Sequence, residues 1–377
     1  MMGDRKKVMK YSTLYFFIYC PLGVMCPLIS QYLNSIGFTG TQVGIITSLG
    51  TAVAIFAGMF WGEAYANSNK KRWILMSMAL ASGGLALIST GTKVFIIYAA
   101  LYGCLYFFQG PLHGLCDSLV IERTESFSFI RAFGAFGYAI AVFAAGEFAE
   151  ATGLKNIFYI YAIAYVIAAL IIMTEQEPPL RKQKEEKIKA TVLLHNKKYV
   201  KLMISVFFVC GTNVANSTYF GFLFREGGGD VAGIGLAFLL MAGSEAPFMM
   251  MVPTLIRKFT SSKLILITMI ISALRFAFYA TGPSAGMLLS TFFLQGIVNG
   301  ILLVELVRYI SRIVDEKYNS VAIATYYAIA NSLSIIICNL LGGGILDHFG
   351  PAAVYGFFAI YNVIAVILYV GMGLHKE

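Results

Sequence analysis

Long apolar stretches separated by short polar breaks run through the whole 377-residue chain. A helix that crosses about 30 Å of hydrocarbon needs about 20 apolar residues, and one stretch after another reaches that length. The pattern therefore predicts an all-α integral membrane protein with twelve transmembrane helices. Their expected ranges are 11–35, 41–66, 72–90, 94–121, 129–150, 157–174, 199–224, 231–256, 263–281, 285–310, 319–345 and 351–372.

Composition supports this prediction. The chain is 58% hydrophobic and 12% charged, and its mean hydropathy of +0.76 is above that of water-soluble domains. The basic start resembles a signal peptide, but the first apolar stretch is too long for one, so we expect an uncleaved helix. The six cysteines show no metal or redox spacing and are expected to pack as small core residues.

The positive charges are distributed unevenly. If the N-terminus is cytoplasmic, most of the 28 lysine and arginine residues lie on the cytoplasmic side, and the outer segments contain Lys93, Lys155 and Arg225. This bias follows the positive-inside rule. We therefore expect a multi-pass plasma-membrane protein with both termini in the cytoplasm, and we attribute the net charge of +9 to topology rather than to nucleic-acid binding.

One long polar break, residues 174–201, divides six expected helices from six. Its Pro178-Pro179 pair and dense charge indicate a cytoplasmic linker, and its pattern also suits a short amphipathic helix on the membrane surface. The predicted domains are an N-terminal six-helix bundle (1–174), a linker (175–197) and a C-terminal six-helix bundle (198–377).

A short motif recurs in the two halves. QGPLHG (Gln109–Gly114) lies in the expected fourth helix, and QGIVNG (Gln295–Gly300) lies in the tenth. The shared pattern QGxx[HN]G at matching helices favours a duplicated six-helix unit, with two pseudo-symmetric bundles arranged as parallel repeats.

The expected fourth helix has three polar residues, Gln109, His113 and Asp117, spaced by four along one face. Ionisable groups within transmembrane helices usually face the protein interior, so this face is a candidate solute site. His113 has two interpretations, a polar packing residue or a member of a proton relay.

Arg131 begins the expected fifth helix and shares a face with small residues that let helices approach closely. These residues are Gly134, Gly137, Ala141, Ala144 and Ala145. Asp117 and Arg131 lie near the two ends of the same connecting turn, within reach of one another in an antiparallel helix pair. We expect them to pair, either as a structural staple or as part of a solute site.

The second half has its own charges within helices. Glu245 in the eighth helix and Arg275 in the ninth form a second candidate pair, either for proton coupling or as a static contact. Pro247 favours a bend beside Glu245. Glu305 and Arg308, three residues apart near the cytoplasmic end of the tenth helix, predict an interfacial salt bridge.

Amide side chains complete the set of candidate solute contacts: Asn213, Asn216, Gln295, Asn299 and Asn331. The chain has no zincin, Walker-type or GxSxG motif, and its four histidines are scattered. We therefore expect no enzyme activity, no metal and no cofactor.

Several segments resemble a known family. YFFIYCPLGVMCPLISQYLNSIGFTGTQVGII near the start, and EAPFMMMVPTLIRKF, LRFAFYA, LVRYISRI and NLLGGGILDHFG in the last third, are similar to the lactose-permease-like branch of the major facilitator superfamily. This branch includes oligosaccharide:proton symporters, nucleoside permeases and phenylpropionate-type permeases. The resemblance implies two six-helix bundles with a binding site at the membrane midplane.

The resemblance also implies residue roles. IRAFGAFGYA is similar to the lactose permease segment whose arginine binds the sugar and whose aromatic residue stacks on it, which correspond to Arg131 and Tyr138. The helix-four carboxylate of that family corresponds to His113 by strict offset and to Asp117 by the broader pattern. Glu245 and Arg275 resemble its helix-eight carboxylate and helix-nine arginine.

The chain also departs from lactose permease. Neutral residues stand where that permease has its helix-ten histidine and glutamate, its paired helix-seven aspartates and its helix-eleven lysine: Gln295, Val298, Asn213, Asn216 and Asn331. Both sides of the charge pair are neutral, so no unpaired ion is left. Proton coupling would then depend on Glu245, Asp117 or Glu305.

These observations predict a secondary active transporter that works by alternating access and takes up a small polar or ring-bearing solute, sugar-like first, with protons. The alternatives are an exporter of amphipathic compounds, a nucleoside or aromatic-acid permease, and a non-transporting sensor. The expected partners are the solute, the proton and the lipid bilayer, and we expect a monomer.

Overall fold

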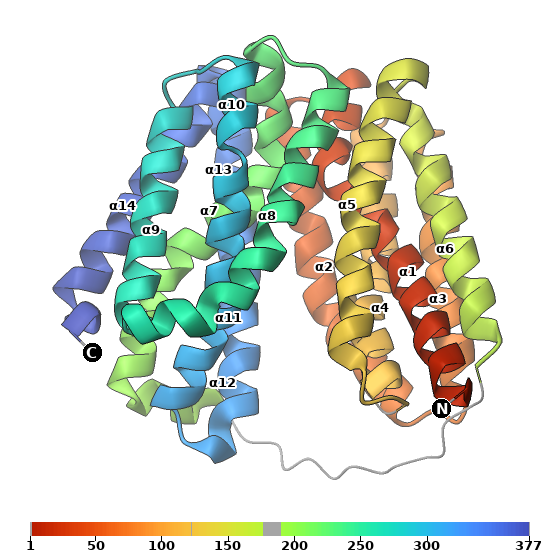
Figure 1. Cartoon of the computed structure of the whole chain (residues 1–377). Helices are drawn as coiled ribbons and strands as arrows, with labels where there is room; N and C mark the ends of the chain where they lie inside the picture. The colour runs from red at the N-terminus through yellow and green to blue at the C-terminus, as the bar shows by residue number, and fades with distance from the viewer. Residues whose placement is uncertain (1, 122, 176–189, 377) are drawn as a thin grey trace. The chain divides into compact units, whose positions relative to one another are not determined.

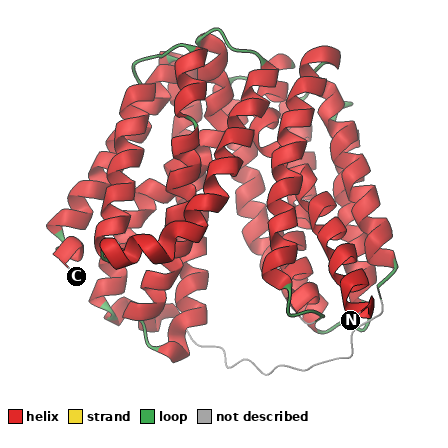
Figure 2. Cartoon of the chain, in the orientation of Figure 1, coloured by secondary structure: helices red, strands yellow, loops and turns green. Residues whose placement is uncertain are grey.

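The computed structural model describes residues 2–121, 123–175 and 190–376, and within these ranges the chain forms helices and no strand (Figures 1 and 2). Twelve of the described helical segments are long and apolar enough to cross a membrane. The predicted fold class, an all-α membrane protein with twelve transmembrane helices, is therefore confirmed.

The first half of the chain contains six long helices. They are α1 (Met2–Ser35), α2 (Gly40–Ala66), α3 (Lys71–Ser89), α4 (Phe95–Ile121), α5 (Phe127–Thr152) and α6 (Ile157–Met173), with a short 3-10 helix, η1 (Leu154–Asn156), before α6. Local sequence sets their ends. Thr39 and Gln42 form a capping box at the start of α2. Gly153, with φ +104°, directly follows α5, where a left-handed backbone favours glycine.

The second half contains the remaining helices. They are η2 (Ala190–His195), α7 (Lys197–Glu226), α8 (Val231–Lys258), α9 (Ser261–Tyr279), α10 (Ala285–Thr291), α11 (Phe293–Ile313), η3 (Glu316–Tyr318), α12 (Asn319–Tyr326), η4 (Tyr327–Leu333), α13 (Ser334–Phe349), α14 (Pro351–Gly371) and η5 (Leu374–Lys376). The surface helix expected in the linker falls largely on residues 176–189, which lie outside the described residues, and η2 follows them.

Two predicted helices are each divided in the structure. The helix expected at 285–310 consists of α10 and α11, because the Phe292 and Gln295 amides donate to carbonyls only three residues back, at 3.2 and 3.0 Å. The helix expected at 319–345 consists of α12, the π-helix η4 and α13. Within η4 the Ser332 hydroxyl donates to the Tyr327 carbonyl at 3.1 Å, five residues back.

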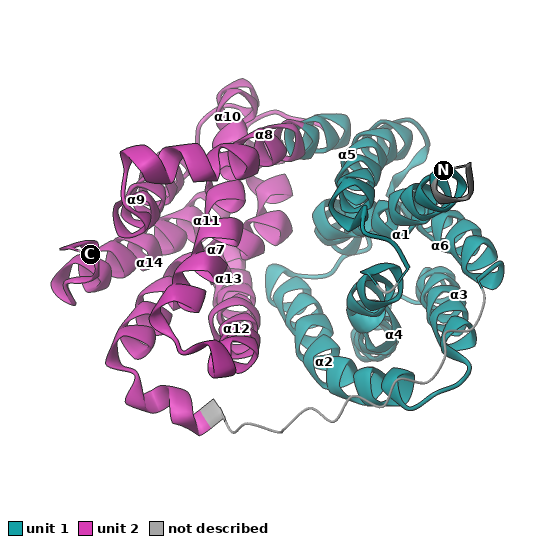
Figure 3. Cartoon of the chain, turned by 60° about the horizontal axis from the view of Figure 1, so that its bottom comes forward, with its two compact units in different colours: residues 1–184, 231–239 teal, residues 185–230, 240–377 magenta. Residues whose placement is uncertain are grey.

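The chain divides into two compact units, residues 1–184 with 231–239 (unit 1) and residues 185–230 with 240–377 (unit 2) (Figure 3). In unit 1, α1 packs on α5 and α6, and α3 packs on α4 and α6. In unit 2, α7 packs on α13 and α14, and α9 packs on α11 and α14. When the transmembrane helices of each half are numbered one to six, these pairs are the same, which supports the duplicated unit.

The repeated glycine motif explains a further matching pair. A Cβ on Gly110 of α4 would lie 2.6 Å from the Ala54 Cβ of α2, and a Cβ on Gly296 of α11 would lie 2.9 Å from the Glu245 amide nitrogen of α8. In each half, the first glycine of QGxx[HN]G thus lies where the fourth helix meets the second. Small residues permit this close approach.

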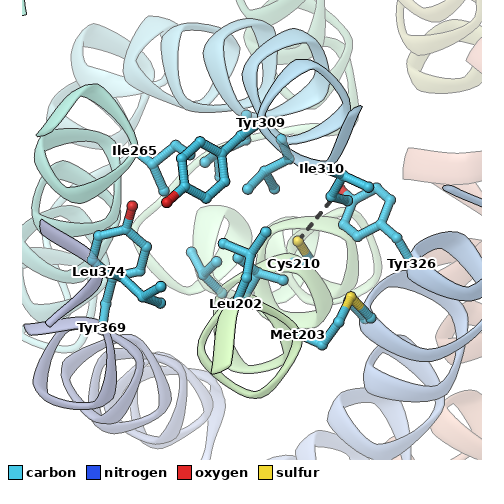
Figure 4. Close-up of a cluster of buried hydrophobic side chains, with 14 of the residues drawn as sticks. Leu202, Met203, Cys210, Ile265, Tyr309, Ile310, Tyr326, Tyr369 and Leu374 are labelled. Atoms are coloured by element: carbon cyan, nitrogen blue, oxygen red, sulfur yellow. Dashed lines mark hydrogen bonds between the residues drawn. The ribbon is translucent and has the colours of Figure 1, made fainter. Parts of the chain in front are cut away.

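A cluster of buried apolar side chains forms the core of unit 2 at the ends of the helices near the linker (Figure 4). Its members come from η2, α7, α9, α11, α12, η4, α14 and η5, and include Leu202, Ile265 and Tyr309. Tyrosine hydroxyls in the cluster have their own partners. Tyr369 donates to the Ser262 carbonyl at 3.1 Å, and Tyr326 lies 3.7 Å from the Cys210 sulfur.

Candidate functional site

Polar side chains from α1, α4 and α5 meet in unit 1. Asp117 of α4 is half-buried and accepts a hydrogen bond from the Tyr15 hydroxyl of α1 at 2.5 Å. The guanidinium of Arg131 on α5 lies over the ring of Tyr19 on α1, 4.2 Å from its centroid. A carboxylate, an arginine and two aromatic rings are therefore gathered within one unit.

The predicted Asp117–Arg131 ion pair does not form among the described residues. Asp117 bonds to Tyr15 and Arg131 stacks on Tyr19, although the two charges remain close enough to interact electrostatically. The reason lies in the packing of α1 on α5. A Cβ on Gly134 would lie 2.7 Å from the Tyr19 ring, so the absence of that Cβ lets Tyr19 occupy the space beside Arg131.

The small-residue face predicted on α5 is largely confirmed. Gly134, Gly137, Ala141 and Ala145 are buried, and Gly137 lies against the Phe16 carbonyl of α1. Ala144 is exposed, so its place on this face was wrong. It lies at the edge of this face, about 80° around the helix from Gly134 at 3.6 residues per turn.

His113 links α4 to α1. Its Nε2 lies 3.0 Å from the Ile18 carbonyl, which can only accept, so Nε2 is the donor. Its ring centroid is 4.7 Å from that of Tyr19. Tyr19 thus contacts both His113 and Arg131, and the packing interpretation of His113 is supported by this bond.

The other predicted contacts of the first half have different surroundings. Gln109 is buried and accepts a hydrogen bond from the Tyr161 hydroxyl of α6 at 2.7 Å, so it joins α4 to α6. Tyr138 lies two turns after Arg131 and is half-buried, and its backbone carbonyl packs against Gly23 of α1.

Unit 1 also has a cavity of about 660 Å³ between α1 and the start of α5. Phe16, which follows Tyr15 in the sequence, is one of its lining residues, but the predicted solute residues do not line it. Its lining residues are Arg5, Val8, Met9, Ser12, Thr13, Phe16, Ser126, Phe129 and Phe133.

In unit 2, a hydrogen-bond network centred on Asn213 of α7 joins four of the predicted residues. Its Oδ1 accepts from Arg275 Nη2 of α9 at 3.1 Å, and its backbone carbonyl accepts from Gln295 Nε2 of α11 at 2.9 Å. Gln295 also donates to Asn299 Oδ1 at 3.1 Å. Asn213 Nδ2 in turn donates to the Ser272 hydroxyl at 3.0 Å.

Arg275 donates to Asn213 and lies over the Phe276 ring, 4.4 Å from its centroid, and its predicted pairing with Glu245 stays a prediction. Arg275 is 3% exposed, and its Nε and Nη1 atoms have no hydrogen-bond partner in the described chain. Glu245 is half-buried on α8, where its backbone packs against Gly296. Unit 2 therefore buries a cation beside a neutral amide.

Two further amides lie apart from this network. Asn216 is buried and accepts a hydrogen bond from the Tyr355 hydroxyl of α14 at 2.7 Å. Asn331 is half-buried within the π-helix η4, a type of helical irregularity that is frequent at functional sites.

The predicted interfacial salt bridge of Glu305 with Arg308 is wrong. Glu305 is fully buried, and neither carboxyl oxygen has a hydrogen-bond partner among the described residues. The helical period explains this. Leu302, Glu305 and Tyr309 follow at steps of three and four, so Glu305 shares the face of α11 that enters the apolar core.

Sequence reasoning missed the two α1 tyrosines. Tyr11, Tyr15 and Tyr19 are spaced by four and therefore share a helix face, a signal that is visible in YSTLYFFIY. Among the described residues there is no group of three or more His, Cys, Asp or Glu side chains that could hold a metal ion.

Comparison with known proteins gives consistent matches. Residues 8–357 match the MFS_1 like family. The chain is 31% identical to the maltose permease of Geobacillus stearothermophilus, covering 95% of this chain and 92% of the permease. It is 30% identical to the uncharacterized transporter YwbF of Bacillus subtilis (strain 168), over 93% and 89%. It is 24% identical to the sucrose permease of Escherichia coli, over 96% and 91%.

Solved structures share the fold. The nucleoside transporter NupG superposes with a TM-score of 0.87 at 17% identity, covering 97% of this chain and 98% of NupG. A D-xylose-proton symporter superposes with a TM-score of 0.73 at 15% identity, covering 97% of each chain. At these identities the likeness concerns the arrangement of the helices.

Proposed function

We propose, since the chain belongs to the MFS_1 like family and is a multi-pass membrane transporter, that it takes up a disaccharide of the maltose type together with protons. The permeases for maltose and sucrose that match it along nearly their whole length support this substrate class. Both sugars are neutral, with two rings and many hydroxyl groups. We infer transport rather than catalysis.

The observation that carries this proposal is the contact between Arg131 and Tyr19 beside the Tyr15–Asp117 hydrogen bond. Sugars present hydroxyl groups around the ring and C–H groups on its faces. Arg131 would donate to the hydroxyls through its planar fork, Asp117 would accept from them, and an aromatic ring would contact the C–H face. Tyr138 keeps its predicted role as a stacking residue in this proposal.

The amides of unit 2 suit the same solute. An amide both donates and accepts, as a sugar hydroxyl does. Asn213, Gln295 and Asn299 already form one network with Arg275, which a hydroxyl-rich solute could enter by exchange of hydrogen bonds. Asn216 and Asn331 remain predicted contacts on the same grounds.

Coupling to protons is part of the proposal. The chain shares its fold with a D-xylose-proton symporter, and its transmembrane helices contain the carboxyl groups that exchange would require, Asp117, Glu245 and Glu305. Arg275 would affect exchange through its charge. The excess of basic residues in the inner segments supports a plasma-membrane location with both termini in the cytoplasm, and the proposed working unit is a monomer in the lipid bilayer.

The test combines binding and coupling. Purified protein is heated with maltose, sucrose, uridine or phenylpropionate, and a bound ligand raises the unfolding temperature. Maltose is expected to give the largest shift, and adding maltose to cells that express the protein is expected to make the medium more alkaline. A shift with uridine or phenylpropionate and none with either sugar would contradict the sugar assignment. Accumulation of the sugar outside the cells would indicate export.

A further inference from the structure

We propose that the cavity between α1 and the start of α5 binds an anionic phospholipid from the leaflet that surrounds the start of α1. In the orientation proposed above this is the cytoplasmic leaflet, and the site does not depend on which solute is transported. The predicted solute residues do not line the cavity, so it is separate from the candidate solute site. Its volume of about 660 Å³ lies within the range of about 300 to 1,000 Å³ that is typical of ligand sites.

The cavity lies at the depth where a phospholipid changes from polar to apolar. The membrane-spanning part of α1, Arg5–Ser35, has 31 residues. At about 1.5 Å per residue it is about 46 Å long, whereas the hydrocarbon layer is about 30 Å thick. With α1 centred in the bilayer, Arg5 lies about 8 Å outside the hydrocarbon, Ser12 lies near its boundary, and Phe16 lies about 8 Å inside.

The chemistry of the lining changes in the same order along α1. Among the described lining residues Arg5 is the only charged one, and it stands at the level of the headgroups. The hydroxyl groups of Ser12 and Thr13 follow at the level of the ester groups, and the ring of Phe16 lies at the level of the acyl chains. This order matches the phosphate, the esters and the chains of a phospholipid.

The start of α5 supplies the other wall. α1 and α5 pack together and begin at the same end of unit 1 (Figure 1). The rings of Phe129 and Phe133 extend the apolar part of the lining. Ser126, the N-cap residue of α5, makes no side-chain cap bond, so the start of this helix leaves backbone donors that suit an ester or phosphate oxygen.

Ser12 is an independent sign of a ligand. Its side chain is 4% exposed and lines the cavity, yet its hydroxyl group has no hydrogen-bond partner among the described residues. The neighbouring Thr13 hydroxyl donates to the Met9 carbonyl at 2.9 Å, a bond that hydroxyl groups in helices often make. A buried hydroxyl without a partner is unfavourable. An ester carbonyl of a phospholipid in the cavity would accept from Ser12 and remove this cost.

An anionic phospholipid accounts for these features together. The guanidinium of Arg5 suits a phosphate group, and the exposed Lys6 and Lys7 beside it favour a headgroup with a net negative charge. A free phosphate ion would leave the phenyl rings unexplained, and an alkyl chain alone would leave Arg5 and Ser12 unexplained. The bound lipid would contact both α1 and α5 and would stabilise their packing.

Native mass spectrometry and thermal unfolding of the purified, delipidated protein test the site, with dioleoylphosphatidylglycerol as the probe. This lipid is expected to bind about 10-fold more tightly than dioleoylphosphatidylcholine and to raise the unfolding temperature. Sodium phosphate alone is expected to cause no shift. Equal affinity for the two lipids, or an equal shift with phosphate alone, would overturn the proposal.

Two neighbouring cations distinguish a site from attraction to a basic surface. Arg5→Gln is expected to weaken the binding of dioleoylphosphatidylglycerol by about 10-fold, because it removes a charged contact with the phosphate. Lys6→Gln is the matched control, since Lys6 is exposed and does not line the cavity, and a loss of no more than about 2-fold is expected. Equal losses in the two variants would show that no site exists around Arg5.

Ser12→Ala separates a lipid contact from a structural role. Without lipid, this variant is expected to unfold at the same temperature as the wild type or at a higher one, because the deleted hydroxyl has no partner. Its affinity for dioleoylphosphatidylglycerol is expected to fall by about 2- to 10-fold. An unchanged affinity, or a lower unfolding temperature without lipid, would refute the role of Ser12 as a lipid contact.

Discussion

The buried charged residues of units 1 and 2 have different kinds of partners. In unit 1, Asp117 accepts from Tyr15, Arg131 lies on the Tyr19 ring, and the buried Glu175 forms an ion pair with Lys10. In unit 2, Arg275 has a neutral amide as its acceptor, and Glu305 has no partner in the described chain.

This difference suggests that the two units have different roles in transport. Charges that already have partners change little in energy between conformations, so they suit the recognition of a solute. Charges that are buried without a counter-ion are costly, and a conformation that solvates them or changes their protonation relieves that cost. We therefore expect unit 1 to determine solute affinity and unit 2 to determine how conformation depends on protons.

The largest effect is expected when a carboxylate is added to unit 2. Asn213→Asp would place a negative charge at the atom that lies 3.1 Å from Arg275 Nη2, and we expect a gain of about 1 kcal/mol in the free energy of unfolding. Asn216→Asp is the matched control. Asn216 is buried and accepts from the Tyr355 hydroxyl rather than from an arginine, so a loss of about 2 to 3 kcal/mol is expected.

Thermal unfolding of the two purified variants in the same detergent gives the comparison. Equal destabilisation by both substitutions would show that Arg275 already has an adequate counter-charge, and the contrast between the units would then be wrong.

In unit 1, Arg131→Lys is expected to weaken maltose binding by about 10- to 100-fold, because lysine keeps the charge but loses the planar fork, a loss of about 1.5 to 3 kcal/mol. Titration calorimetry measures this change. Arg308→Lys, at a half-buried arginine of α11, is the control and should leave the affinity unchanged. Wild-type affinity in Arg131→Lys would make Arg131 a structural contact of Tyr19 only.

The repeated motif gives a third comparison. A Cβ on Gly300 would lie 2.6 Å from the Glu245 carbonyl oxygen, whereas the equivalent Gly114 has no atom within 4 Å. Gly300→Ala is therefore expected to lower the free energy of unfolding by about 1 to 2 kcal/mol. Gly114→Ala is expected to raise it by about 0.5 to 1 kcal/mol, since alanine is the better helix former. Thermal unfolding distinguishes these signs, and destabilisation by both would mean that the two helices pack alike.

The sequence was sufficient to predict the helices, because length and hydropathy determine which segments can cross a bilayer. It also predicted the duplicated motif, whose first glycines meet the second helix in each half. It did not predict the break at Phe292 or the π-helix around Asn331, since both depend on local hydrogen bonding that hydropathy does not report.

The sequence predicted which residues belong to the candidate site, but it did not predict which side chains they contact. Asp117 and Arg131 do lie near one another, yet Tyr15 and Tyr19 are their direct partners. Those partners come from α1, far away in the sequence, and reach the site because Gly134 leaves room for a ring. Which side chain fills such a space depends on the register between helices, and spacing within one helix does not fix that register.

The smallest changes in the free energy of unfolding are expected when the two buried glutamates, Glu175 and Glu305, are each replaced by glutamine. Glu175 is 5% exposed, accepts from Tyr11 at 3.1 Å and is paired with Lys10, which is 30% exposed. Because Lys10 is partly solvated, Glu175→Gln is expected to lower the free energy of unfolding by only about 1 kcal/mol. Glu305→Gln replaces a carboxyl group that has no hydrogen-bond partner in the described chain with an amide of the same shape, and it should change the free energy of unfolding by less than about 0.5 kcal/mol.

The free energy of unfolding of both variants is measured at neutral pH, with and without about 1 M salt. At this concentration the Debye length is about 3 Å, so salt weakens interactions between partly exposed charges. Salt should reduce the difference between wild type and Glu175→Gln, because it weakens the partly exposed pair with Lys10. It should leave the Glu305→Gln difference unchanged. If Glu305→Gln instead changes the free energy of unfolding as much as Glu175→Gln does, and with the same salt dependence, the contrast between the two buried carboxyl groups would not hold.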